Sequence, residues 1–247
     1  MKALVLCAGM GTRLGSLTEN LPKPMLTLGN EPLLAYMMRY LARNGICEVA
    51  INLHFKADVI RNFLGEGTRF GLRIHYSYEE VLLGTAGAAK NIEDYFLPDE
   101  DFLVVYGDLL LDQPLQPMLD FHRRVGASAT LLLHRTSSSN SLVQLNDDWR
   151  ITHFIERPSV EERGAYPFEW ANSGLQILNR RVLEFIPAGR SVDFPKDVYA
   201  QMVDIEPTLW VYGFPLSGYR CAIDSPRRYL EAQQAVESGL LSLEPSH

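Results

Sequence analysis

The segment KALVLCAGMGTRLGSLTENLPKPML, residues 2–26, decides how the rest of the chain is interpreted. Its near-continuous apolar start is typical of a strand covered on both faces, and Gly9 and Gly11 follow at once. Glycines at that point let backbone N–H groups approach an anion closely, because no Cβ stands in the way. Ten residues after Arg13, Lys23 lies between two prolines that restrain the backbone and direct its charge. The segment therefore predicts a strand that ends in a loop for an anionic ligand.

Two common phosphate-binding motifs do not match this loop. Gly9 and Gly11 agree with the dinucleotide pattern G-x-G-x-x-G, but Leu14 stands where the third glycine is required. The loop also lacks the G-K-[ST] ending of a P-loop. The glycines alone are equally compatible with a plain tight turn and solvated cations, and it is the restrained Lys23 that favours binding.

The first half of the chain alternates strand and helix patterns. Apolar strands are predicted at 47–53, 72–78 and 101–107, and helices at 31–45, 57–67 and 88–96. This alternation indicates βαβ units and an α/β fold, with a Rossmann-like, mostly parallel central sheet flanked by helices. Ligands are then expected at the carboxyl ends of the strands.

The second half indicates a small, β-rich part. An Asn-Asp-Asp turn separates two alternating runs in 141–156, which predicts a hairpin, and further strands are expected within 169–178 and 208–223. Residues 226–240 read as a closing helix. We expect one domain over 1–240, with a nucleotide-binding half at 1–135, a sugar-phosphate-binding half at 136–240, and a tail at 241–247.

Composition narrows the classes of protein. A formal net charge of −7 over 247 residues argues against a nucleic-acid partner. No apolar run approaches the ~20 residues that span a bilayer, and no signal peptide is evident, so we expect no membrane association and a cytoplasmic location. Three widely separated cysteines predict neither a disulfide framework nor a CxxC metal site. The six histidines show no HxxxH spacing and are interpreted as surface or packing residues.

Several motifs in order resemble one family. The LCAGMGTRL segment followed by PKPML is similar to the signature of the sugar-1-phosphate nucleotidyltransferases, also called sugar-nucleotide pyrophosphorylases, although Cys7 replaces the usual alanine or proline. Further similarities are LLGTAGAAK at 82–90, VVYGD at 104–108, FIERP at 154–158 and ANSGLQIL at 171–178. The resemblance extends to about residue 235 and is nearest to the mannose- and heptose-1-phosphate guanylyltransferase-like members.

The resemblance implies a reaction and a set of site residues. A sugar-1-phosphate oxygen attacks the α-phosphorus of a nucleoside triphosphate and pyrophosphate leaves, with Mg²⁺ as cofactor and no protein nucleophile. The catalytic residues implied are Arg13 at the β- and γ-phosphates, Lys23 at the α-phosphate, and Asp108. The nucleotide-binding residues implied are Leu6, Ala8, Gly9, Gly11, Thr12, Arg13, Gly84, Thr85 and Gly87. The sugar-phosphate-binding residues implied are Gly107, Glu156, Arg157, Asn172 and Gly174.

The metal ligands implied are Asp108 and Asp224, and here the pattern departs from the family. Many members carry D-x-G-[ST]-P near the end, whereas this chain reads AIDSP, with Ala222 at the aspartate position. Some cytidylyltransferase relatives show an acid-x-D-T-P arrangement, and against these Asp224 falls on the second acid. Arg157 likewise replaces the commoner lysine and retains the ability to grip phosphate.

The nucleobase and the biological role leave alternatives open. The Gly-Thr-Ala-Gly form at 84–87 favours GTP, with UTP or dTTP next. Two other classes compete: a catalytically silent nucleotide-sugar-binding regulator, which AIDSP would permit, and an NAD(P)-dependent oxidoreductase, against which the missing third glycine and Lys23 argue. The sugar is not evident from the sequence, and the oligomeric state is open, a homo-oligomer included.

Overall fold

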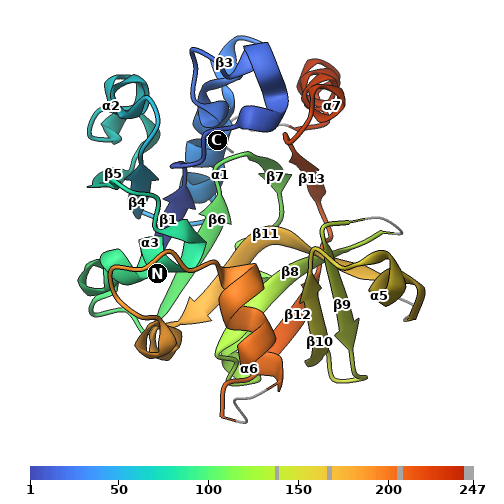
Figure 1. Cartoon of the computed structure of the whole chain (residues 1–247). Coiled ribbons are helices and arrows are strands. Elements are labelled where there is room, and N and C mark those ends of the chain that lie inside the picture. Colours follow the sequence, from blue (N-terminus) through green and yellow to red (C-terminus); the bar gives the residue numbers. More distant parts are fainter. Residues whose placement is uncertain (137–138, 166–168, 205–207, 242–247) are drawn as a thin grey trace. The chain divides into compact units, whose positions relative to one another are not determined.

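The chain is arranged in two units, each built from stretches that are separated in the sequence. The computed structural model describes residues 1–136, 139–165, 169–204 and 208–241 (Figure 1). Unit 1 comprises Met1–Leu82, Val105–Pro114 and the chain from Ser217 onward, and unit 2 comprises Leu83–Val104 and Leu115–Leu216. The units therefore interleave along the chain and do not divide at residue 135. The assignment of substrates to 1–135 and 136–240 stays a prediction, and residues 242–247 of the expected tail lie outside the described residues.

Unit 1 holds the predicted parallel sheet. Strand β4 pairs in parallel with both β1 and β5, with Leu4 opposite Ala50 and Ala50 opposite His75. The bounds are β1 Lys2–Leu6, β4 Glu48–Leu53 and β5 Arg73–Tyr78, with helices α1 Leu33–Arg43 and α2 Ala57–Leu64 between them. These strands and helices confirm the βαβ expectation for the first half of the chain.

A second pair of strands completes unit 1. Strand β7 (Leu109–Asp112) pairs antiparallel with β13 (Tyr219–Ala222), so segments more than a hundred residues apart lie side by side. Helix α7 (Pro226–Glu237) follows, and the Ser225 side chain accepts a hydrogen bond from the Arg228 amide at its N-terminus. A short antiparallel pair, β2 (Thr27–Leu28) and β3 (Glu31–Pro32), lies before α1.

Unit 2 contains the predicted β-rich part. The hairpin is confirmed, because β9 and β10 pair antiparallel, and β11 pairs with β8 and β9. Strand β8 was not predicted, although its run ATLLLHR is apolar and buried, and it also pairs in parallel with β12. The bounds are β8 Ala129–Arg135, β9 Ser141–Leu145, β10 Ile151–Glu156, β11 Trp170–Asn179 and β12 Val211–Pro215.

Short helices accompany these strands in unit 2. They are α3 Gly84–Asn91, α4 Leu115–Arg124, α5 Val160–Ala165, a π-helical turn Phe194–Tyr199 and α6 Ala200–Asp204. Helix α3 begins at Gly84 and gives way to a 3₁₀ turn at Glu93–Phe96, whereas the sequence predicted one helix over 88–96. Strand β6 (Asp101–Tyr106) carries the chain from unit 2 into unit 1.

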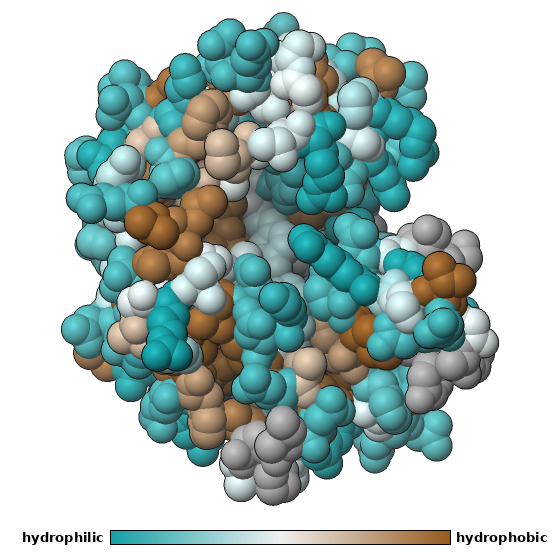
Figure 2. Space-filling model, in the orientation of Figure 1, coloured by the Kyte–Doolittle hydropathy of each residue, from teal (hydrophilic) through white to brown (hydrophobic). Residues whose placement is uncertain are grey.

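The buried strands are apolar, and the surface visible in Figure 2 is mostly polar. The strands β1, β4 and β6 are almost wholly buried, as sheet strands covered on both faces are. The face shown in Figure 2 is mostly hydrophilic, with hydrophobic residues in small groups. No helix among the described residues combines the length and apolar character that crossing a membrane requires. The chain is thus an α/β protein with a mostly parallel sheet flanked by helices.

Candidate active site

The loop after β1 is held at both ends by the protein itself. The Cys7 amide donates to Asn52 Oδ1 (2.8 Å), and Asn52 Nδ2 donates to Glu79 Oε1 (2.9 Å), in a buried arrangement. Further along, Leu14 is 3% exposed and packs among Leu26 and Leu33 in the core. The residue that replaces the third glycine of the dinucleotide pattern therefore anchors the loop.

Between those anchors the two glycines differ in their surroundings. A Cβ on Gly9 would have no neighbour within 4 Å, so this position faces open space. Gly11 has a φ of +66° and lies against Thr18 and the Lys23 Cβ, while Thr18 Oγ1 donates to the Gly11 carbonyl (2.8 Å). A left-handed backbone at Gly11 is strained for other residues, which explains the glycine there.

The remaining predicted loop residues lie in the same short segment. Leu6 ends β1 and Ala8 is buried, whereas Thr12 and Arg13 are exposed in a 3₁₀ turn at Thr12–Leu17. The guanidinium of Arg13 is therefore carried on an exposed side chain of the segment that follows Gly9 and Gly11.

Lys23 and Asp108 meet directly. Lys23 Nζ lies 2.5 Å from Asp108 Oδ2, and the side chains are 13% and 23% exposed. Lys23 belongs to a 3₁₀ turn at Lys23–Met25 between Pro22 and Pro24, as the restrained backbone predicted. Two groups 85 residues apart in the sequence thus converge on one point, next to the glycine loop.

Asp108 is placed by the close approach of two chain segments. The Gly107 amide donates to the Leu6 carbonyl (3.0 Å), and a Cβ on Gly107 would lie 2.7 Å from Cys7 Sγ. Only glycine allows this approach, so packing explains a residue that the family resemblance assigned to the sugar phosphate.

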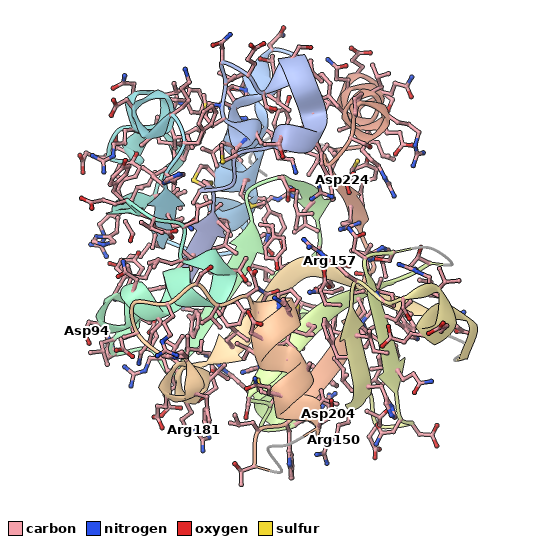
Figure 3. All side chains as sticks on the ribbon, viewed as in Figure 1. Asp94, Arg150, Arg157, Arg181, Asp204 and Asp224 are labelled. Atoms are coloured by element: carbon pink, nitrogen blue, oxygen red, sulfur yellow. The ribbon has the colours of Figure 1, made fainter. Side chains whose placement is uncertain are left out.

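The Asp108 carbonyl accepts a hydrogen bond from the Ile223 amide (2.9 Å), and Ala222 lies opposite Leu109. Asp224 follows Ile223, the residue whose amide bonds to Asp108, so the backbones of Asp224 and Asp108 lie close together. Figure 3 labels Asp224 just beyond β13.

Two carboxylates in one region fit what Mg²⁺ requires, since this ion usually takes one or two protein carboxylates together with phosphate oxygens and water. Asp108 and Asp224 would hold such an ion, which would neutralise charge on the phosphates. Among the described residues no group of three His, Cys, Asp or Glu side chains forms a cluster of its own for a metal. The donor set suits an ion shared with a phosphate ligand.

The second glycine segment, Gly84–Gly87, lies in unit 2 and packs tightly. A Cβ on Gly84 would lie 2.5 Å from the Val192 carbonyl oxygen, and one on Gly87 would lie 2.6 Å from that of Arg190. The amides of Ala86 and Gly87 donate to the Val192 carbonyl (2.9 and 3.0 Å). The amides expected to face a base are thus already bonded within the protein.

Thr85 is fixed by Asp193. Asp193 Oδ1 accepts from the Thr85 amide (3.1 Å) and from Thr85 Oγ1 (3.2 Å), and Thr85 Oγ1 in turn accepts from the Phe194 amide (2.8 Å). The start of α3 is therefore joined to the 190–194 segment by side-chain as well as backbone bonds.

Four of the five predicted sugar-phosphate-binding residues belong to unit 2, whereas Gly107 belongs to unit 1. Burial raises the pKa of Glu156 to about 7; the charge of Arg157 acts in the opposite direction and that of Asp193 adds to the increase. Arg157, labelled in Figure 3, is exposed directly after β10 with a φ of +54°, and its amide donates to the Asn140 carbonyl. Burial is thus the main cause of the raised pKa of Glu156.

Asn172 and Gly174 shape a local irregularity of β11. Asn172 Oδ1 accepts from the Gly174 amide (3.0 Å), Gly174 has a φ of +83°, and the register with β8 shifts between Asn172 and Gln176. The Asn172 amide donates to Ser141 Oγ (2.9 Å). The Asn172 side-chain oxygen thus helps to shape this turn.

Sequence reasoning missed four residues of these regions: Asn52, Glu79, Asp193 and Arg220. Asn52 had a signal, because it is the only polar side chain in the apolar run VAINL. Asp193 and Arg220 had none, since Thr85, which bonds to Asp193, and Asp108, whose charge acts on Arg220, each lie about 110 residues away.

Comparison with known proteins agrees with this architecture. Residues 2–218 match the family described as Nucleotidyl transferase. The chain belongs to this family. It is 33% identical to a UTP–glucose-1-phosphate uridylyltransferase of Synechocystis over 219 residues, which cover 83% of the chain and 55% of the relative.

Two mannose-1-phosphate guanylyltransferases are similar at 30% identity. The enzyme of Candida albicans matches 93% of this chain and 63% of its own, and that of Mycobacterium tuberculosis matches 96% and 65%. The chain therefore spans less than two thirds of these relatives.

Two solved structures share the fold. HddC from Yersinia pseudotuberculosis in complex with GMP-PN has a TM-score of 0.76 at 22% identity, over 95% of this chain and 99% of that one. A putative glucose-1-phosphate thymidylyltransferase from Bacillus anthracis has a TM-score of 0.81 at 19% identity, over 95% and 94%.

Proposed function

We propose that the protein is a sugar-1-phosphate nucleotidyltransferase, which makes a nucleoside-diphosphate sugar and pyrophosphate from a nucleoside triphosphate and a sugar-1-phosphate. The observation that carries the proposal is the meeting of Lys23 and Asp108 where the Lys23 Cβ lies against Gly11 of the glycine loop. An ammonium group, a carboxylate able to hold Mg²⁺ and an exposed glycine loop are the parts that phosphoryl-type transfer needs. Membership of the family supports the same reaction.

In the proposed reaction an anionic phosphate oxygen of the sugar-1-phosphate attacks the α-phosphorus. A new P–O bond forms as the bond between the α-phosphorus and the bridging oxygen breaks, and its electron pair leaves on pyrophosphate. The attacking oxygen carries no proton at neutral pH, so the protein need not supply a general base. Mg²⁺, when bound, supplies charge neutralisation on the phosphates.

Lys23 neutralises the charge that gathers on the α-phosphate, and Arg13 acts on the departing phosphates. In the structure Lys23 is bonded to Asp108, so nucleotide and metal must compete for the two groups. Before the substrate arrives, the bond to Asp108 keeps the ammonium group oriented. Glu156, Asn172, Gly174 and Arg157 are proposed to contact the sugar phosphate.

We place GTP ahead of UTP and dTTP as the nucleotide. Two of the similar proteins are named guanylyltransferases and one a uridylyltransferase, which supports both of the first two choices. We expect Gly84, Thr85 and Gly87 to contribute to the base site mainly by shaping it, because the amides of Thr85 and Gly87 are bonded to Asp193 and Val192.

Pyrophosphate release tests the proposal. The purified chain is incubated with Mg²⁺, each of five nucleoside triphosphates, and hexose- or heptose-1-phosphates, and products are identified by mass. Turnover with GTP and a sugar-1-phosphate is expected, and it requires both substrates. Binding of nucleotide sugar without turnover under every combination would instead support the silent regulator, to which the loss of an acid at Ala222 points.

A further inference from the structure

A second cation lies near the Lys23–Asp108 pair, on strand β13. Arg220 is opposite Leu111 of β7, two residues before Ala222 on the same strand. Neighbours on a strand alternate between its faces, so Arg220 and Ala222 share one face. The intervening Cys221 and the following Ile223 are buried in the core cluster, whereas Arg220, Ala222 and Asp224 are partly exposed.

This face of β13 leads directly to the candidate active site. The Ile223 amide bonds to the Asp108 carbonyl, and Ala222 lies opposite Leu109, the residue after Asp108. An arginine side chain is long enough to cover the distance of about two residues along a strand, roughly 7 Å. Arg220 can therefore bring its guanidinium to the region between Asp108 and Asp224.

The electrostatics of Arg220 agree with that placement. Burial lowers the pKa of Arg220, and the charge of Asp108, followed by that of Asp224, acts in the opposite direction; Arg228 is the neighbouring cation that also lowers it. The two carboxylates that the family resemblance assigns to the metal are thus the carboxylates whose charges raise the pKa of Arg220. Arginine keeps its charge under all ordinary conditions.

We propose that Arg220 is a phosphate-binding residue of the nucleotidyltransferase site, which holds the β- and γ-phosphates of the nucleotide and then pyrophosphate. The proposal rests on the proposed function and adds a residue to it. A guanidinium can bind phosphate oxygens through two parallel hydrogen bonds. Ala222 lies between Arg220 and Asp224 on this face and carries no charge, so it adds no acid that would compete with phosphate for the guanidinium.

Calorimetry of pyrophosphate binding without metal tests Arg220 directly. We compare wild type with Arg220→Met, which keeps much of the side-chain length but removes the charge, and with Arg220→Lys. Arg220→Met is expected to weaken pyrophosphate binding about tenfold or more, since charge-assisted hydrogen bonds are lost. Arg220→Lys is expected to recover part of the loss. The matched control is Arg227→Met, because Arg227 is an exposed cation of α7 that pairs with Glu231.

Kinetics separate this role from a structural one. Arg220→Met is expected to raise the KM for the triphosphate and the inhibition constant of pyrophosphate, while the KM for the sugar-1-phosphate stays within about twofold. Thermal unfolding shows whether Arg220→Met is folded. If it is not, Arg220→Lys becomes the test. A folded Arg220→Lys that binds pyrophosphate as tightly as wild type overturns the bidentate role. The proposal is also overturned if wild type turns over its substrates and a folded Arg220→Met binds pyrophosphate as tightly as wild type does. Absence of turnover in wild type would count against the proposed function instead.

Discussion

Two glycine-containing segments that look alike in the sequence have opposite environments in the structure. Around Gly9 in unit 1, an added Cβ would meet nothing within 4 Å, whereas at Gly84 and Gly87 in unit 2 it would run into backbone at 2.5 and 2.6 Å. The first segment leaves room for something that is not protein. The second uses its glycines to let α3 pack on the 190–194 segment. Similar composition thus leaves open space in one unit and serves internal packing in the other.

The largest effect expected from this comparison is on the cation beside the open segment. Lys23→Ala should reduce turnover by about a hundredfold or more, equivalent to ~3 kcal/mol, because a charge contact made mainly in the transition state is lost. The fold should persist, since Asp108 remains partly exposed to water. Pyrophosphate release gives the rate, and circular dichroism checks folding. Near-normal turnover by a folded Lys23→Ala would remove Lys23 from the mechanism.

The packed segment should respond through stability. Gly→Ala within a helix ordinarily stabilises by ~1 kcal/mol, yet Gly87→Ala should destabilise by about 1–3 kcal/mol, because its Cβ collides with the Arg190 carbonyl oxygen. Chemical denaturation measures the change. Ala88→Gly, on the next residue of α3, serves as the control for helix propensity, with allowance for its own buried methyl. If Gly87→Ala were as stable as wild type, the packing explanation would be wrong.

Gly9→Ala should show the reverse pattern. The position has no left-handed backbone and no close neighbour, so the free energy of unfolding should change by less than about 0.5 kcal/mol. Its methyl group would occupy the open space that we assign to the phosphates, and triphosphate affinity should fall about tenfold. Calorimetry with the triphosphate measures this. Unchanged affinity would place the phosphates elsewhere.

Sequence reasoning could predict the open segment because its signals are local. The apolar run of β1, the glycines and the prolines around Lys23 lie within 25 residues, and each restricts the backbone in a known way. The same holds for the βαβ order and for the β9–β10 hairpin, where spacing and turn residues carry the information.

The packed segment could not be predicted in the same way. What Gly87 touches depends on Arg190, about a hundred residues later, and no local pattern encodes that contact. Arg220 reaches the region of Asp108 only through the pairing of β13 with β7. Strand β8 was missed although its continuous apolar run has the same character as that of β1, from which a buried strand was predicted. The interleaved units likewise depend on long-range contacts.

The smallest expected effect is on the pH dependence of stability, and it concerns an acidic residue in each unit. In unit 1 the carboxylate of Asp108 has a cation at 2.5 Å, whereas in unit 2 burial raises the pKa of Glu156 from its ordinary 4.5 to about 7. Between pH 4.5 and about 7, the folded protein binds more protons at Glu156 than the unfolded chain does. Stability contributed by this group is therefore greatest at low pH and declines as pH rises from 4.5 to 7.

Glu156→Gln should remove that decline, because a glutamine side chain does not titrate. The difference in melting temperature between variant and wild type should thus shift in favour of the variant as pH rises from 5 to 8. Glu161→Gln, at an exposed position of α5, should leave the pH dependence as it is in wild type. Parallel curves for wild type and Glu156→Gln across this range would show that Glu156 ionises normally. The contrast between the units would then lie in the glycines alone.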